Sequence, residues 1–144
     1  MTVSPGTTSG NGNPALLLVA PLLPLFILMV LLWGRIFRVH SIGQRFSIVG
    51  IILTLVHLVI AFIYQRISLA KYRDIIKEAL IEKNGQADSQ YLQDITTGLT
   101  IHVNNQYFNF NTFLMFISLS ILFALAFYLW DILDNKKRDK DVEG

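Results

Sequence analysis

The residue with the most potential for chemistry is His57, near the middle of the charge-free apolar run 47–64. An ionisable side chain at that depth in a bilayer is costly, and a proton relay, ligand or gate is its first functional reading. The two other long apolar runs, 14–33 and 112–130, contain no Asp, Glu, Lys or Arg that could complete a relay. We therefore favour an ordinary hydrogen bond from His57 to a Ser, Thr or carbonyl of a neighbouring helix over proton transfer.

The rest of the chain offers few groups for catalysis or metal binding. His40 and His102 are far from His57 in sequence, and Asp88 and Asp94 lie in a polar stretch. There is no Cys, which excludes thiol chemistry and disulfides, and there is no phosphate-binding glycine loop or zinc-protease motif. We expect a protein that is not an enzyme and that has no cofactor and no metal. A net charge of +2 is too small to indicate nucleic acid as a partner.

Three apolar runs dominate the chain and must position everything else. Runs 14–33, 47–64 and 112–130 are each long enough for a helix of about 27 Å, close to the roughly 30 Å hydrocarbon core of a bilayer. Backbone groups find no water there, so each run should be helical. The sequence predicts an all-α membrane protein with three transmembrane helices. Pro21 and Pro24 fall inside the first run and predict a bend there.

The loop 34–46 between the first two runs is basic and contains Arg35, Arg38 and Arg45 but no acid. Short basic loops favour the cytoplasmic side of a membrane. Four further basic residues follow the third run, so the inside would hold seven of the 12 Lys and Arg residues. We expect the N-terminus outside and the C-terminus in the cytoplasm. The three arginines are also candidates for contact with lipid or an acidic partner, although lipid-binding clusters usually hold four to eight basic residues.

The extramembrane segment 65–111 begins with a helical pattern over 65–83. Apolar residues recur there at three- and four-residue steps, which predicts an amphipathic helix. This helix either continues the second span or folds onto the membrane surface, and Asn84-Gly85 should end it. Its apolar stripe needs a cover, either from the following segment, from lipid headgroups or from another protein. The candidate contact residues are Leu69, Tyr72, Ile76 and Leu80.

Alternating apolar and polar residues over 99–110 surround Asn104-Asn105. This pattern predicts a short β-hairpin, possible in a chain that is otherwise helical. The alternative is that Tyr107, Phe108 and Phe110 form the aromatic belt at the entrance of the third span. Both can hold together. The ends of the chain, 1–13 and 131–144, are predicted to be a flexible uncharged tail and a frayed charged tail.

Two functions from different classes fit these features. The first is a non-catalytic accessory, assembly or regulatory subunit of a larger membrane complex, with the lipid bilayer and other membrane subunits as partners. The second is a homo-oligomeric pore. In layout, three spans with an outside N-terminus and a charged inside tail are similar to one class of phage holins, which implies such a channel. A third, weaker possibility is a sensor whose outer segment binds a ligand.

Overall fold

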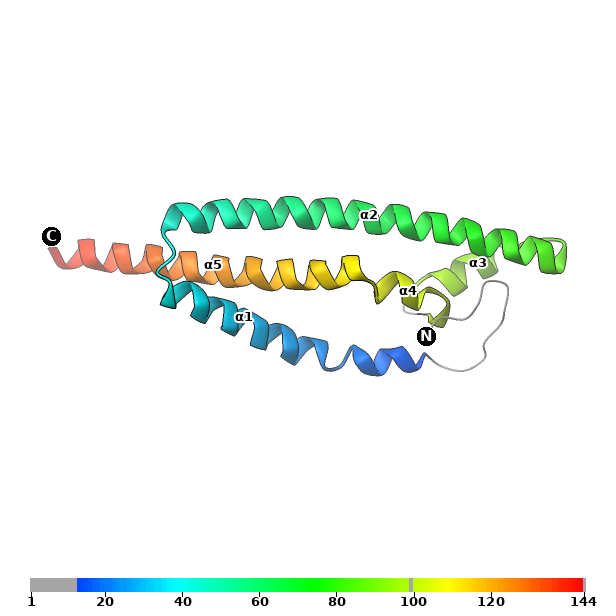
Figure 1. Cartoon of the computed structure of the whole chain (residues 1–144), viewed down its shortest axis with the longest axis horizontal. Coiled ribbons are helices and arrows are strands. Elements are labelled where there is room, and N and C mark those ends of the chain that lie inside the picture. Colours follow the sequence, from blue (N-terminus) through cyan, green and yellow to red (C-terminus); the bar gives the residue numbers. More distant parts are fainter. Residues whose placement is uncertain (1–12, 99, 144) are drawn as a thin grey trace. The chain divides into compact units, whose positions relative to one another are not determined.

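The computed structural model describes residues 13–98 and 100–143. Within that part of the chain every element is helical and no strand occurs. The elements are η1 (Pro14–Leu18), α1 (Leu22–Val39), α2 (Gln44–Asn84), α3 (Ser89–Thr96), η2 (Ile101–Val103), α4 (Asn104–Tyr107) and α5 (Phe110–Glu143), shown in Figure 1. The predicted flexible tail 1–13 lies, except for Asn13, outside the described residues.

Among the described residues, three helices are long and apolar enough to cross a membrane, as the sequence predicted: Ala15–Val39, Gln44–Asn84 and Phe110–Val142. The chain divides into two compact units. The described part of the first unit comprises residues 13–22, 61–98 and 100–113, and that of the second comprises 23–60 and 114–143.

The prolines of the first apolar run act differently from the prediction. η1 ends at Leu18, and a turn separates it from α1, which begins only at Leu22. Pro21 therefore precedes the α-helix, and Pro24 falls in its first turn, where the absent N–H has no intrahelical partner to lose. The prolines thus mark the start of an α-helix, and the predicted bend within a longer helix is replaced by a break.

The residues after α1 end the helix in a tight turn. The Ile42 N–H donates to the Phe37 carbonyl at 3.2 Å, and the Ser41 N–H donates to the Arg38 carbonyl at 3.1 Å. This is the Schellman arrangement, which needs a left-handed residue in its penultimate position. Ser41 takes that conformation with φ of 47°. The chain can then turn directly into α2 at Gln44.

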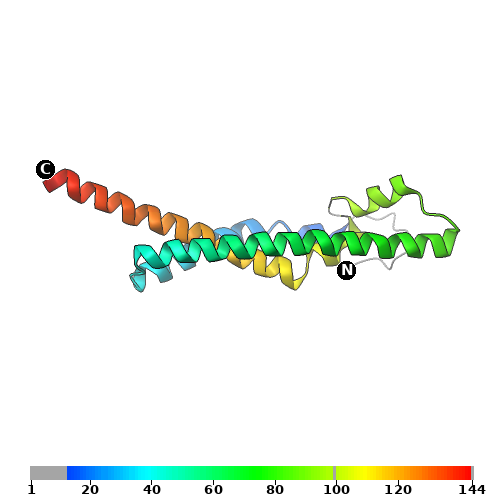
Figure 2. The same ribbon diagram turned by 90° about the horizontal axis from the view of Figure 1, so that it is seen from above.

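α2 is one uninterrupted helix that joins the second span to the predicted amphipathic segment 65–83. It ends at Asn84, and Gly85 follows with φ of 78°, so the predicted stop is confirmed. Figures 1 and 2 both show α3 beside the C-terminal part of α2. The apolar stripe of α2 is covered within the chain, because Ile76 and Leu80 are buried.

The predicted β-hairpin over 99–110 is wrong. The described residues of that range form η2, α4 and the start of α5, with Val103 and Asn104 buried. An isolated two-stranded hairpin leaves its outer backbone groups unpaired and is marginal in water. Helical turns satisfy backbone groups locally. Here they also bury polar and apolar side chains together.

The charged end of the chain also differs from the prediction. α5 continues through Glu143, so the described part of the segment after the third span is helical. The core of the second unit lies on α1 and α5, where Phe37, Ala124, Leu125 and Tyr128 are buried together. Gly50 of α2 meets the same core: a Cβ added there would lie 2.8 Å from Cδ1 of Leu125.

Candidate functional site

His57 has one polar partner in the second unit. Its Nδ1 lies 2.9 Å from the hydroxyl of Ser118, and the tautomer of the ring decides which of the two donates. This is the interhelical hydrogen bond that the sequence favoured. It joins α2 to α5 at the depth of the apolar runs.

Two further hydroxyl groups of these spans bond to their own helices. Thr54 donates to the Gly50 carbonyl at 2.9 Å, and Ser120 donates to the Ile117 carbonyl at 2.7 Å. Ser120 is also fully buried. Each of these groups thus already has a protein partner. Among the described residues, neither Thr54 nor Ser120 therefore extends a proton relay from His57.

The first unit is held by a network of side-chain amides. The Ser68 hydroxyl donates to Oε1 of Gln106 at 2.9 Å, and the Gln65 amide donates to the Gln106 carbonyl. Nδ2 of Asn111 donates to Oε1 of Gln65 and to the Ala61 carbonyl, both at 3.1 Å. These bonds fasten the start of α5 and the short α4 to α2. Buried neutral amides impose a specific geometry because each lost partner costs about 1–3 kcal/mol.

Two reciprocal hydrogen-bond pairs extend this network. The Asn13 and Asn104 amides each donate to the other, at 2.7 and 2.9 Å. Asn109 caps α5: its Oδ1 accepts from the Thr112 N–H at 3.0 Å, while its own N–H donates to the Thr112 hydroxyl at 3.1 Å. That exchange satisfies two backbone donors at the helix start. The Asn-rich stretch 104–111 was the sequence signal for this network. The alternation of polar and apolar residues in the same stretch favoured a hairpin instead.

α3 is fastened to α2 by a charged group. Nε and an Nη of Arg73 donate to the hydroxyl and the carbonyl of Thr96, at 3.0 and 3.2 Å, and Thr96 is fully buried. His102 of η2 is buried in the same unit, and its burial lowers the pKa of the imidazole from its ordinary value near 6.5. Burial therefore favours the neutral form of the His102 imidazole.

The predicted contact stripe of α2 is not a free surface. Ile76 and Leu80 are buried, and Leu69 and Tyr72 are half-buried. The exposed apolar residues lie elsewhere on the same stretch of helix: Ile67, Ile75 and Ile81 are each exposed by 43–52%. Together with the exposed charged residues between them, they form what we term the outward face of α2: Ile67, Lys71, Asp74, Ile75, Glu78 and Ile81.

Of the three arginines that the sequence placed in the loop 34–46, two lie in α1 and one in α2, and Arg38 has a defined partner. Its guanidinium lies 2.8 Å from Oδ2 of Asp131, although the Arg38 side chain is itself 60% exposed. Arg35 and Arg45 are exposed as well. Asp131 is the first charged residue after the third apolar run, so the pair joins the C-terminal end of α1 to α5 where the apolar sequence stops. Lys136 donates to Oε1 of Gln44 at 2.9 Å on the other side of the loop.

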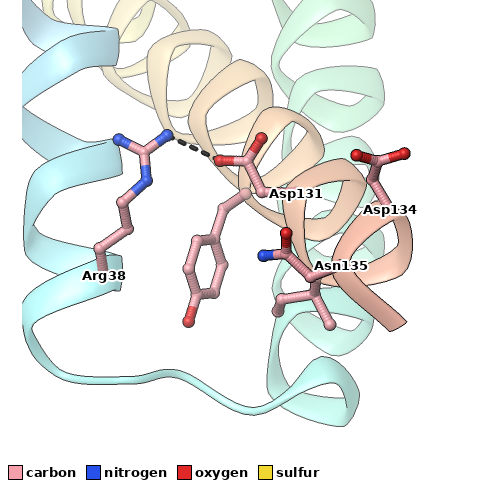
Figure 3. Close-up of a pocket in the computed structure, with 6 residues that line it drawn as sticks. Arg38, Asp131, Asp134 and Asn135 are labelled. Carbon is pink, nitrogen blue, oxygen red and sulfur yellow. Dashed lines mark hydrogen bonds and ion pairs between the residues drawn. The ribbon is translucent and has the colours of Figure 1, made fainter. Parts of the chain in front are cut away.

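A cavity of about 330 Å³ opens beside this ion pair (Figure 3). Figure 3 shows Arg38 reaching from α1 toward Asp131, with Asp134 and Asn135 one turn further along α5. The lining residues are Arg38, Tyr128, Asp131, Ile132, Asp134 and Asn135. The lining therefore includes Arg38, two acidic residues and an amide residue next to a buried aromatic ring, and Figure 3 shows the Asp134 carboxylate directed away from Arg38.

Within residues 13–98 and 100–143, no group of three or more His, Asp or Glu side chains is placed to hold a metal ion. Comparison with known proteins finds no matching family model, no matching curated protein and no matching solved structure.

Proposed function

We propose that this chain is an integral membrane protein that acts as a non-catalytic accessory, assembly or regulatory subunit of a larger membrane complex. The observation that carries the proposal is the outward face of α2. Its three isoleucines are about half exposed on a helix whose opposite face is already covered by the chain. That face lies beyond the second apolar run, where lipid tails would not cover it.

The spacing on this face suits a helical partner. Ile67, Lys71 and Ile75 recur at four-residue steps and share one side of the helix. A partner helix with apolar residues at the same spacing could pack between them, as in helix-in-groove recognition. Asp74 and Glu78 flank the apolar positions, so Lys or Arg on the partner would complement them.

The tight fastening of the first unit supports the same proposal. The amide network and the Arg73–Thr96 bonds fix the helix that carries the outward face. A preorganised surface loses less conformational entropy when a partner binds. The accessory role would then be to present a rigid helix face at the membrane surface.

Single-cysteine crosslinking tests this proposal, because the chain contains no Cys and the introduced residue is then its one thiol. A photo-crosslinker at Ile75→Cys in the native membrane is expected to give an adduct with one other subunit of the complex. The matched control is Gln93→Cys, an exposed position on α3 that lies off the outward face. An adduct from both positions or from neither, or one containing only copies of this chain, would contradict the proposal.

We place the N-terminus outside and the C-terminus in the cytoplasm, since seven of the 12 basic residues then lie inside. Labelling of intact cells with a membrane-impermeant maleimide should modify Gln86→Cys and spare Lys137→Cys. The reverse pattern would invert the assignment.

The homo-oligomeric pore is the alternative, and the polar residues of the spans argue against it. A pore needs a stripe of polar groups that face water. Thr54, His57, Ser118 and Ser120 instead bond to each other or to their own backbone. Ion flux through vesicles that contain only this chain would support the pore and contradict the accessory role.

A further inference from the structure

We propose that the cavity beside Arg38 and Asp131 binds the zwitterionic headgroup of a phosphoethanolamine lipid. This goes beyond the accessory role and does not depend on any protein partner. The inference rests on three observations in the second unit: the position of the cavity, the signs of the charges that line it, and the bonding capacity that those charges still have.

The position favours a lipid headgroup. The cavity lies where the apolar run of α5 gives way to Asp131 and where α1 ends at Val39. Trp130, which immediately precedes Asp131, is 74% exposed, as expected for a ring at the level of the headgroups. The cavity volume of about 330 Å³ is at the lower end of the range for small-ligand sites, which suits a headgroup better than a larger molecule.

The charges favour a zwitterion. Arg38 has five N–H donors and uses one nitrogen for Asp131, so further donors remain for phosphate oxygens. Asp134 forms no ion pair or hydrogen bond within the described part of the chain, and its carboxylate could accept N–H bonds from a primary ammonium. A purely anionic group would meet two carboxylates, and a purely cationic group would meet the guanidinium.

The same argument discriminates among lipids. The ammonium of ethanolamine has three N–H donors for Asp134 and Asn135. A choline headgroup carries the same charge but no N–H, and it is bulkier. A glycerol headgroup has no positive charge to neutralise Asp134. Phosphatidylethanolamine should therefore bind about tenfold more tightly than phosphatidylcholine or phosphatidylglycerol, since charge-assisted hydrogen bonds are the stronger kind.

The test is a lipid titration of the purified full-length protein in detergent, followed by native mass spectrometry of the lipid-bound fraction. Each titration uses dioleoyl phosphatidylethanolamine, phosphatidylcholine or phosphatidylglycerol. Asp134→Asn should lower the affinity for phosphatidylethanolamine about tenfold and remove the preference over phosphatidylcholine. Asp139→Asn is the matched control, because it removes the same charge from an exposed site of α5 outside the cavity and should leave the preference intact.

A second variant distinguishes a loss of lipid contact from a loss of folding. Arg38→Gln should weaken binding of phosphatidylethanolamine and phosphatidylcholine alike, since both lose the guanidinium that holds the phosphate. Equal binding of all three lipids by the unmodified protein, or an unchanged preference in Asp134→Asn, would overturn the proposal. Displacement of the lipid by an equal concentration of free phosphoethanolamine would overturn the assignment to a membrane lipid.

Discussion

The two units of this chain are held by different kinds of contact. In the first, buried polar residues such as Asn104 and Gln106 bond to the backbone and side chains around them. In the second, Phe37 and Leu125 belong to an apolar core, and Gly50 lies against Leu125. Apolar packing depends on volume, whereas an amide network depends on donors and acceptors. The second unit should therefore be sensitive to added bulk, and the first to lost hydrogen bonds.

The largest effect is expected where added bulk enters the second unit. Gly50→Leu would drive a side chain into Leu125 and should destabilise the unit by about 3 kcal/mol. Gly34→Leu is the control, because an added Cβ there meets nothing within 4 Å. Thermal unfolding in detergent measures both. Equal stability of the two variants would show that α2 and α5 are not packed at this point.

The second-largest effect is expected where a hydrogen bond is removed from the first unit. Gln106→Ala leaves the Ser68 hydroxyl without its acceptor and should cost about 2 kcal/mol. Hydrogen exchange of the backbone amides over 101–109 should accelerate, while the amides of the second unit should not change. Gln86→Ala, at an exposed position, is the control. Faster exchange in both units would show that they unfold together.

Acid should loosen the first unit through His102. Burial lowers the pKa of this imidazole, so between the lowered pKa and about 6.5 the unfolded chain binds more protons than the folded chain. The stability that this group contributes is present above pH 6.5 and declines as the pH falls below it. The protection factors of the backbone amides over 101–109, which correct for the slower intrinsic exchange in acid, should be smaller at pH 5 than at pH 7.5, and His102→Gln should reduce the difference. The exposed His40→Gln should preserve it.

The smallest effect is expected at His57. His57→Leu removes one interhelical hydrogen bond to Ser118, and such bonds contribute about 0.6 kcal/mol in membrane proteins. Ser118→Ala should cost about the same, and the double variant should cost less than the sum. If His57→Leu instead abolishes function or changes its pH dependence, the residue transfers protons and the structural interpretation is wrong.

The sequence predicted the spans because a charge-free apolar run has few alternatives to a transmembrane helix. It also located the end of α2, since Gly85 supplies the left-handed backbone that ends a helix. It failed over 99–110, where alternation was too short to distinguish a strand from helical turns. In that segment Asn104 and Gln106 are buried by hydrogen bonding to residues distant in sequence.

The candidate site was predicted only in part. His57 and Arg38 were identified from residue type and position, but their partners Ser118 and Asp131 lie more than 60 residues away in the chain. Pairing across that distance depends on how the helices pack. The stripe through Ile76 and Leu80 was recognised as apolar, yet periodicity alone could not say that the chain would cover it itself.

The accessory role is tested most directly by stoichiometry. The protein is extracted from its native membrane in mild detergent and analysed intact by native mass spectrometry. We expect it in a fixed ratio with other subunits, and Ile75→Asp on the outward face should release it from them. Recovery only as a monomer or as copies of itself, with Ile75→Asp having no effect, would contradict the account.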